Sequence, residues 1–564
     1  MKLLRWMPAY GTLKQYRAGW IRHDVVAGLS LAAVMVPAGM GYAVASGLPP
    51  ITGLYATVIP LVVYAIFGPS RILIFGPDSA LVPLIATTIL PLAGGQQSRA
   101  ITLAAALGLL TGLICSGAAL ARLGLLSDFL SAPVRHGYVN GLAITIIAAQ
   151  LPNLFGITVR GVGVVHDLSA FAAGLGEGRT AISALGLGTA ALGLILASRT
   201  WAPRVPAVLI AVVLSTVAVG AFGLSRGVQT VGSVPSGLPG PALPSLNLGE
   251  TVQLIPAALA IALLAFTDTA VVSRTFAARG AYEVNPNQEL FALGLVNAAA
   301  GLFQGFPISC SGTRTPVAES TGAKTQVAGL VTAAVIVLLL FLGPGLVRDL
   351  PIAALAAVVI AAAIGLFETR SVAWLYRVDR AEFLLSIVSL LGVLILGVLP
   401  GIALAVALSL LDFVRHAWRP HDAILGRVQG LKGYHDLARH PDARQVPGLV
   451  LFRWDAPLFF ANASLFRERV RTLLMRADPR MRWMVIAAEP ITDIDSTAFE
   501  VLKALQLELR SSGVELGFAE MKGPVKDRLR LYGMSGVKFF PTVGVAVREY
   551  VQETGVDWRD WEEN

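Results

Sequence analysis

Residues able to do chemistry are concentrated in one short polar stretch within an otherwise apolar part of the chain. Residues 306–315 include two helix breakers, Pro307 and Gly312, several hydroxyl side chains and one arginine, Arg314. A proline and a glycine interrupt a membrane-spanning helix, and the interruption is tolerated where it lines a cavity. Backbone N–H groups left unpaired at a helix start attract anions, and so does a guanidinium. This stretch therefore predicts an anion-binding site.

A second stretch, about 235 residues earlier, repeats this pattern. Residues 71–80 begin with a β-branched and aromatic run, continue through a glycine–proline break, and end with Asp78, Ser79 and Ala80 at the start of an apolar helix. Two interrupted spans at corresponding places in two halves of a chain indicate the substrate site of an inverted-repeat transporter. The sequence therefore predicts that both breaks contribute to one site.

Composition predicts that most of the chain lies in a membrane. Of the 564 residues, 55% are hydrophobic and only 14% are charged, whereas about 25% are charged in a typical soluble protein. Residues 1–419 contain 24 Lys and Arg and 15 Asp and Glu, while residues 420–564 contain 20 of each. The apolar part therefore carries all of the net charge of +9, and its basic residues flank apolar segments as a topology signal. We expect a domain boundary near residue 420 and no nucleic-acid partner.

The apolar segments are long enough and numerous enough to predict a polytopic α-helical protein with about fourteen transmembrane segments. Seven segments precede and seven follow a Gly/Pro-rich loop at residues 224–247, so the transport domain covers residues 24–419, with repeats at about 24–222 and 254–419. The bias of Lys and Arg predicts that both termini are cytoplasmic in a cell (inner) membrane. Residues 1–23 are expected to form a cytoplasmic amphipathic N-terminus.

The last part of the chain has a different pattern from the apolar part. Residues 446–564 alternate strand-like and helix-like segments, which predicts a small cytoplasmic α/β domain. Residues 420–445 are expected to link it to the membrane part. Asp495, Ser496 and Thr497 lie at a predicted strand-to-helix junction, where Ser496 is in position to cap the helix.

Motifs of several other protein classes are missing from the sequence. It contains no Gly-x-x-x-x-Gly-Lys-Ser/Thr phosphate loop, which argues against an ATP-driven pump. It also contains no His-Glu-x-x-His zinc motif and no nucleophile elbow, so we do not expect an enzyme, a cofactor or a metal site. Cys115 and Cys310 both lie in apolar sequence far apart, which predicts two free thiols.

Five short motifs are spread over the apolar part, at residues 47–55, 76–77, 287–290, 308–314 and 321–326. In combination they resemble the sulfate permease (SulP) family of anion transporters, and the tail is similar to the STAS domain that this family carries. The resemblance implies fourteen spans in two inverted repeats of seven. It also implies a core domain moving against a gate domain, a substrate held between spans 3 and 10, and a homodimer.

The resemblance also implies which side chains form the substrate site. Ser311, Gly312 and Thr313 would supply hydroxyl and backbone donors, and Arg314 would supply the positive field for an oxyanion. Alternatively, Arg314 is structural and pairs with Glu319 or Asp268, because intramembrane charges often pair with one another. The first span and the third span complete the implied site with Tyr42, Asp78, Ser79 and Ala80.

Asp268 is the only acid in the predicted eighth span, where a charge at the bilayer centre costs about 2.5 to 3.5 kcal/mol. In the family that the chain resembles, an acid here often binds the coupling ion, and sodium-dependent members have a hydroxyl one turn later. This sequence has Val272 there, which favours a proton over sodium. Asp78 and Asp268 near one arginine would form a proton-binding cluster, unless Asp78 only caps its half-helix.

These features predict a secondary active transporter of a small inorganic or organic anion, such as sulfate, bicarbonate or a dicarboxylate. We expect proton-coupled symport by alternating access, with the anion, the proton and the lipid bilayer as partners. An anion channel or exchanger of the same fold is one alternative, and a membrane sensor or scaffold acting through the STAS domain is another. In similar STAS domains the serine after the aspartate can be phosphorylated, so Ser496 is either a regulatory position or a helix cap.

Overall fold

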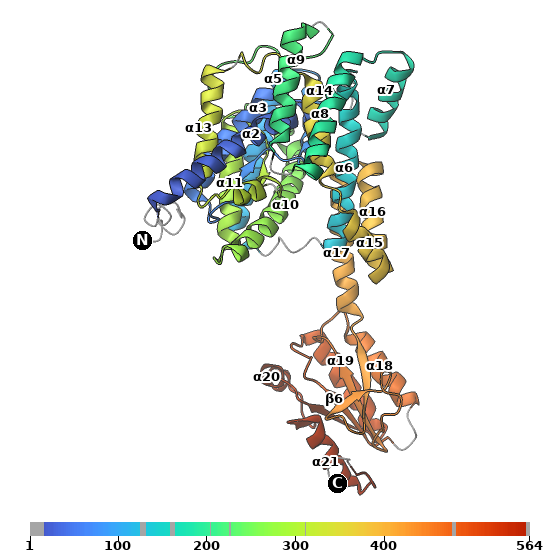
Figure 1. Ribbon diagram of the computed structural model, residues 1–564. Helices are drawn as coiled ribbons and strands as arrows, with labels where there is room; N and C mark the ends of the chain where they lie inside the picture. The colour runs from blue at the N-terminus through green and yellow to red at the C-terminus, as the bar shows by residue number, and fades with distance from the viewer. Residues whose placement is uncertain are drawn as a thin grey trace. The chain divides into compact units, whose positions relative to one another are not determined.

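The computed structural model describes residues 16–124, 131–157, 164–202, 205–224, 227–310, 312–343, 345–476 and 481–559. It divides into two units: the first ends at Ser409 and the second begins at Leu410. The first unit is helical, and the second contains a β-sheet with helices on both faces (Figure 1).

The first unit is a bundle of apolar helices. Within the described residues, seven helical segments are long and apolar enough to cross a membrane, and four further apolar helices are shorter. This supports a polytopic membrane domain, while the count of fourteen spans and the inverted repeats stay predictions. The helices are α2 (Ile21–Ala45), α3 (Pro50–Phe67), α4 (Val82–Ala93), α5 (Gln97–Leu120), α6 (Ala132–Leu154), α7 (Val164–Gly176), α8 (Ile182–Trp201), α9 (Ala207–Phe222), α10 (Leu248–Arg279), α11 (Pro286–Leu302), α12 (Arg314–Ser320), α13 (Val327–Leu342), α14 (Ile352–Ile364), α15 (Thr369–Val378), α16 (Arg380–Leu396) and α17 (Val398–Trp418).

The predicted N-terminal segment 1–23 stays a prediction, and the buried part of the first helix begins at Asp24. The helix α2 starts at Ile21, and Asp24 in its first turn is fully buried. The Asp24 carboxylate accepts hydrogen bonds from the backbone N–H groups of Lys324 and Thr325, at 2.7 and 3.1 Å. The first turn of α2 is therefore part of the packed bundle, because a buried acid has found partners there. Residues 1–15 lie outside the described residues.

Each of the two predicted breaks contains a two-residue strand. The strands β1 (Phe75–Gly76) and β2 (Ser309–Cys310) pair in an antiparallel sense, with Phe75 opposite Cys310 and Gly76 opposite Ser309. The short helix α12 follows β2 closely, and α4 follows β1 after one turn. Two interruptions far apart in the sequence therefore meet in space.

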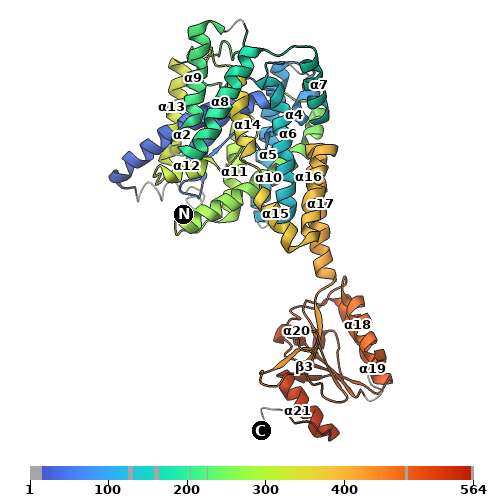
Figure 2. The same cartoon turned by 45° about the vertical axis from the view of Figure 1, so that its right-hand side comes forward.

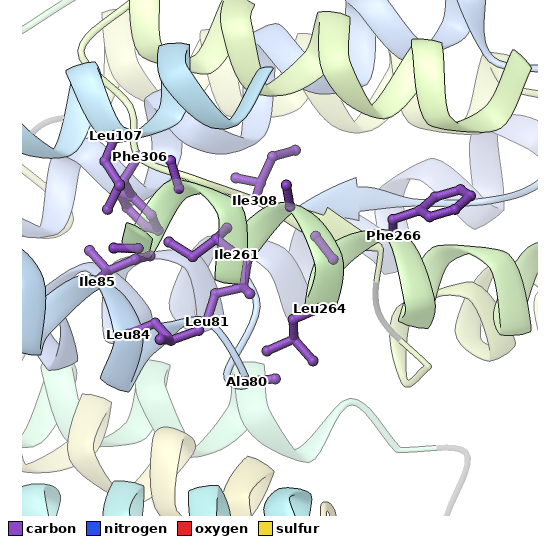
Figure 3. Packing of buried hydrophobic residues seen from close by; sticks show 14 of the residues in the cluster. Ala80, Leu81, Leu84, Ile85, Leu107, Ile261, Leu264, Phe266, Phe306 and Ile308 are labelled. Atoms are coloured by element: carbon purple, nitrogen blue, oxygen red, sulfur yellow. The ribbon is translucent and has the colours of Figure 1, made fainter. Parts of the chain in front are cut away.

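Apolar packing fixes the helices around these breaks. Leu84 and Ile85 of α4 lie beside Ile261 and Leu264 of α10 in one buried cluster (Figure 3). The helices α5 and α11 pack so closely that a Cβ at Gly112 would lie 2.4 Å from the backbone nitrogen of Ala298. Small residues allow such close approach between membrane helices.

The second unit is an α/β domain with one mixed sheet in the order β4-β3-β5-β6-β7-β8. The strands β5 to β8 run parallel, and β3 pairs antiparallel with both β4 and β5. Helices α18, α19 and α20 cover one face and α21 covers the other (Figure 2). The elements are β3 (Asp422–Arg427), β4 (Tyr434–Asp436), β5 (Leu449–Trp454), α18 (Ala463–Arg476), β6 (Trp483–Ala487), α19 (Ser496–Ser511), β7 (Glu515–Ala519), α20 (Gly523–Leu531), β8 (Lys538–Phe540) and α21 (Val543–Thr554).

The expectation that residues 420–445 form a linker is wrong. This segment supplies β3 and β4, and β3 pairs along four residues with β5. Ala423 and Leu425 of β3 are buried in the same cluster as Val547 of α21. The domain therefore begins before residue 446, because its first strand covers the edge of β5 and closes the core on that side.

Candidate functional site

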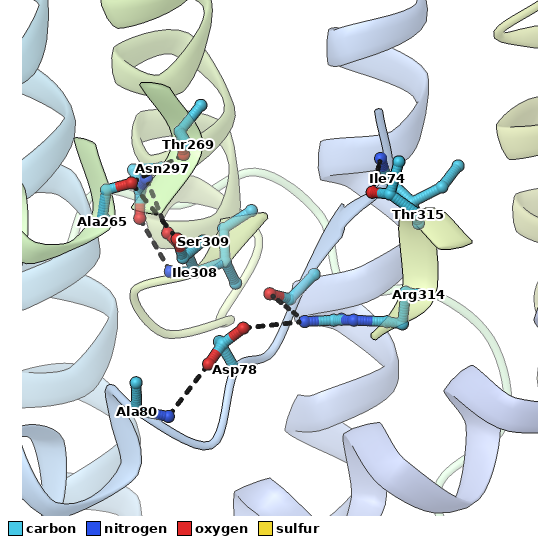
Figure 4. A network of polar contacts seen from close by, with 11 residues as sticks. Ile74, Asp78, Ala80, Ala265, Thr269, Asn297, Ile308, Ser309, Arg314 and Thr315 are labelled. Atoms are coloured by element: carbon cyan, nitrogen blue, oxygen red, sulfur yellow. Dashed lines mark hydrogen bonds and ion pairs between the residues drawn. The ribbon is translucent and has the colours of Figure 1, made fainter. Parts of the chain in front are cut away.

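Arg314 and Asp78 form a buried ion pair where the two breaks meet (Figure 4). The Nη2 atom of Arg314 lies 3.4 Å from Oδ2 of Asp78 and 3.4 Å from the carbonyl oxygen of Gly76. Arg314 is 4% exposed and Asp78 is 8% exposed. Burying a charge this deeply is unfavourable unless a partner of opposite charge lies beside it. Each of the two residues therefore offsets the cost of burying the other.

Local backbone structure sets the positions of both charges. The other oxygen of the Asp78 carboxylate, Oδ1, accepts the backbone N–H of Ala80 at 2.9 Å, which fixes the turn before α4. The hydroxyl of Thr315 in α12 accepts the N–H of Ile74 at 3.3 Å, which ties α12 to the segment entering β1. A Cβ at Gly76 would lie 2.7 Å from Nη1 of Arg314. A side chain at this point of β1 would therefore force the guanidinium to shift from its place beside Asp78.

The predicted residues of the first span and of the first break gather around this pair. Tyr42 of α2 is buried, and its phenol lies next to Ser79 and within electrostatic reach of Arg314 and Asp78. Ser79 and Ala80 are also buried in the turn before α4. The structure thus brings these five predicted residues together from three separate segments.

The remaining predicted residues of the second break lie at its exposed side. Gly312 and Thr313 form a turn directly before α12, and both are exposed. No described atom lies within 4 Å of a Cβ built on Gly312. Ser311 lies outside the described residues. The turn therefore leaves open space on one side of the segment that carries Arg314.

Asp268 lies on α10 and is partly buried. No described residue forms a hydrogen bond or ion pair with its carboxylate, and it is close enough to Asp78 for the two negative charges to repel. Its helix contacts the second break directly, because the hydroxyl of Ser309 donates to the carbonyl of Ala265 at 3.3 Å. Asp268 is thus a second acid near the site, and its carboxylate has no hydrogen-bond partner among the described residues.

The alternative partners expected for Arg314 are wrong. Glu319 instead accepts a hydrogen bond from Nη1 of Arg279, at 2.9 Å. Asp268 makes no ion pair with any described residue, and Asp78 takes that role. The alternative that Asp78 only caps its half-helix is wrong, because the N-cap of α4 is Leu81, without a side-chain cap. Asp78 instead holds the turn before the helix with one oxygen and faces Arg314 with the other.

Two polar residues of α11 contact the breaks without having been assigned a role from the sequence. Glu289 belongs to the motif at residues 287–290, and Asn297 lies eight residues further along the same helix. Both are buried and bonded to the segments that enter the two strands. A carboxylate and an amide within an apolar helix are the signal that could have identified them.

The cap of α19 in the second unit is Asp495 rather than Ser496. One oxygen of Asp495 accepts the N–H of Ala498 at 2.7 Å, and the other accepts the N–H of Phe460 at 2.8 Å. The backbone of Asp495 is extended, as an N-cap requires. Ser496 is therefore the first helical residue, and its side chain is exposed. Its phosphorylation stays a prediction.

Neither the cysteines nor the described acidic and histidine residues form a metal centre. Cys115 and Cys310 are free and buried, as the sequence predicts. Among the described residues, no group of three or more His, Cys, Asp or Glu side chains is arranged to hold a metal ion.

Comparison with known proteins identifies relatives over nearly the whole chain. The sulfate permease family matches residues 21–389, and the STAS domain matches residues 440–546. A probable sulfate transporter of Mycobacterium tuberculosis is 40% identical over 526 residues, which are 93% of this chain and 94% of the relative. The chloroplastic sulfate transporter 4.1 of Arabidopsis thaliana is 30% identical over 586 residues, covering 99% of this chain and 85% of the relative.

Solved structures share the fold. The inward-facing structure of the murine solute carrier 26 family member A9 anion transporter matches with a TM-score of 0.89 at 22% identity, covering 98% of this chain and 95% of that chain. The transmembrane domain of BicA, a cyanobacterial bicarbonate transporter, matches with a TM-score of 0.62 at 22% identity, covering 69% of this chain and 98% of that chain.

Proposed function

Because this chain belongs to the sulfate permease family and carries a STAS domain, we propose that it is a secondary active transporter of a small oxyanion. Sulfate is the first candidate, since sulfate is in the names of the two relatives described above. Bicarbonate and a dicarboxylate belong to the same class of substrate. The observation that carries the proposal is a buried arginine, balanced by one carboxylate, at the meeting point of two interrupted helices.

Arg314 has donors to spare for an anion. Its contacts with Asp78 and Gly76 both use Nη2, whereas a guanidinium has five N–H donors in a planar fork. Such a fork matches the oxygens of a sulfate or carboxylate. An anion on the open side of the turn at Gly312 could therefore take the remaining donors.

Proton coupling follows from the charge balance of the pair. With Asp78 ionised, its charge neutralises Arg314 and also repels an incoming anion. Protonation of Asp78 removes that negative charge and leaves the guanidinium positive, so an anion and a proton bind more readily together than either binds alone. We expect Asp268 to share or pass on this proton, because it is an acid without a hydrogen-bond partner among the described residues and its helix bonds to the second break. This makes proton symport the proposed mode of transport.

The rest of the proposal concerns the architecture. We take the fourteen spans to form two inverted repeats of seven, with a core and a gate that move relative to each other and expose the site alternately to the two sides. The protein would act as a homodimer with cytoplasmic termini. The fold that the chain shares with solute carrier 26 member A9, which was solved in an inward-facing state, supports the proposal of alternating access.

The direct test is uptake of labelled sulfate, bicarbonate and fumarate by the purified protein in lipid vesicles. An inward proton gradient should accelerate uptake of one of them, a sodium gradient should have no effect, and Asp268→Asn should lose the gradient dependence. Arg314→Ala should abolish uptake, while Arg279→Ala, which removes an exposed arginine bonded to Glu319, should retain it. Strict sodium dependence would contradict proton coupling, and flux that only follows the anion gradient would indicate a channel.

A further inference from the structure

We propose that α11 holds both interrupted helices in register. Its side chains Glu289 and Asn297 would be positioning residues for the Arg314–Asp78 pair. The proposal rests on the proposed function of that pair as the anion site. It assigns a role to two buried polar residues that contact neither of the two charges.

Glu289 holds the segment that enters β1. Its side chain is buried, and its two oxygens accept hydrogen bonds from the hydroxyls of Tyr64, at 2.6 Å, and Ser70, at 3.1 Å. Ser70 lies between α3 and β1, five residues before Phe75. From the other side, the amide of Gln326 donates to the carbonyls of Ser70 and Leu73, both at 2.9 Å. The chain is thus fixed on two sides just before the first break.

Asn297 holds the segment that enters β2 in the manner of a neighbouring strand. Its Oδ1 accepts the N–H of Ile308 at 2.8 Å, and its Nδ2 donates to the carbonyl of the same residue at 3.1 Å. Figure 4 shows Asn297 beside Ile308, next to Ser309 of β2. One side chain therefore satisfies both backbone groups of a fully buried residue, and no strand is needed there.

The two anchors lie on one rigid helix. They are eight residues apart, which is about 12 Å along the axis and within one helical stripe. The helix itself has little freedom, because a Cβ at Gly294 would lie 2.7 Å from the backbone nitrogen of Ser116 in α5. Since β1 and β2 pair with each other, a helix that fixes both entering segments also fixes the distance between Asp78 and Arg314.

The chemistry of the two residues suits positioning rather than substrate binding. No cation among the described residues contacts Glu289, so its carboxylate is held by hydroxyl donors alone. Without it, the hydroxyls of Tyr64 and Ser70 lose their buried acceptor, and without Asn297 both backbone groups of Ile308 are unpaired. A buried polar group without its partner is unfavourable enough to open the segment locally.

Cys310 provides a direct reporter of this opening. It lies in β2 opposite Phe75, is 2% exposed, and is one of only two cysteines in the chain. In the full-length protein carrying Cys115→Ala, Cys310 is the only thiol. We expect Asn297→Leu, which removes both bonds to Ile308, to raise its labelling rate with N-ethylmaleimide at least tenfold, since the loss of a single buried hydrogen bond already corresponds to roughly a tenfold change. Glu289→Leu should have a similar effect, because β1 covers Cys310.

A matched control exists on the same helix. The Oδ1 atom of Asn287 accepts the N–H of Gly124 at 2.8 Å. Asn287→Leu is therefore the same substitution as Asn297→Leu and removes a hydrogen bond of the same length, but at a place away from both breaks. Its Cys310 labelling should match the parent. Asn297→Asp, which keeps an oxygen for the N–H of Ile308, should give an intermediate rate and serves if the leucine variant does not assemble.

Transport kinetics separate positioning from general damage. If α11 positions the anion site, Glu289→Leu and Asn297→Leu should raise the KM for the anion more than they lower the maximal rate. Glu289→Gln should recover most of the affinity, since its amide oxygen still accepts one hydroxyl. If Cys310 is labelled as slowly in both leucine variants as in Asn287→Leu, the proposed positioning role of α11 is wrong. If Cys310 is labelled rapidly in the leucine variants but the parent protein transports no oxyanion, the positioning role of α11 stands and the proposed function is refuted.

Discussion

Replacing Asp78 by asparagine separates the charge of the buried pair from its geometry. Asparagine keeps an oxygen that can accept the N–H of Ala80, so the turn before α4 is retained. The guanidinium of Arg314, now 3.4 Å from a neutral amide, loses its counter-charge. At that distance the attraction between unit charges is about 5 kcal/mol for an effective dielectric constant of about 20. Removing one partner of a buried pair costs about 3–5 kcal/mol of stability.

This cost should be visible in the thermal unfolding of the purified protein without substrate. Asp78→Asn and Arg314→Ala should each lower the midpoint, whereas the double variant should recover much of the loss because it buries no unpaired charge. Sulfate should restore Asp78→Asn, since the anion replaces the missing carboxylate, and should not restore Arg314→Ala. The recovery by sulfate should also be independent of pH in Asp78→Asn, because no proton has to bind.

The assay is a melting curve for the parent, both single variants and the double variant, with and without sulfate between pH 6 and pH 8. Single variants as stable as the parent would show that the pair carries little energy. A double variant no more stable than the less stable single variant would show that the two charges are not coupled. Either result would refute the argument that Asp78 controls the availability of Arg314.

Three further predictions concern packing and the α/β domain. Gly76→Ala should weaken anion affinity by about 1–3 kcal/mol, because its Cβ would collide with the guanidinium; an unchanged KM would place the anion elsewhere. Residues 420–564 should express as a soluble monomer, whereas residues 440–564, which lack β3 and β4, should aggregate through the uncovered edge of β5; equal solubility of the two fragments would contradict this. Hydrogen bonds from two arginines of α18 lower the pKa of Glu508, so its stabilising effect is present above its ordinary value of about 4.3 and is lost as pH falls below it. Glu508→Gln should therefore lower the melting temperature of the 420–564 fragment at pH 7 but not at about pH 3; an equal loss at both values would exclude a charge effect.

The sequence located both breaks because proline, glycine and small polar residues stand out against apolar sequence. It placed Asp78 and Arg314 at one site, but it could not show that the two form an ion pair, since they are 236 residues apart and an ion pair at that separation depends on the tertiary fold. Glu289 and Asn297 were missed for the same reason. Their partners are backbone and hydroxyl groups, which have no distinctive sequence pattern.

In the α/β domain, the helix α19 begins at the strand-to-helix junction that the sequence predicts. The segment at residues 420–445 was misinterpreted because it contains turn residues, and its structure is decided by the pairing of β3 with β5 and of β4 with β3. The cap of α19 was misplaced by one residue. Asp and Ser are equally good caps, so the extended backbone at Asp495 decides between them.

Proton uptake on anion binding tests the central claim most directly. Sulfate binding to the purified protein can be measured by titration calorimetry in two buffers with different heats of ionisation, which reports the number of protons taken up. The parent should take up about one proton per sulfate at pH 7 to 8 and bind about tenfold more weakly for each unit of pH increase. Asp78→Asn should bind sulfate without a proton, and Arg314→Ala should not bind it. Sulfate binding by the parent without proton uptake, or binding by Arg314→Ala with unchanged affinity, would contradict the account.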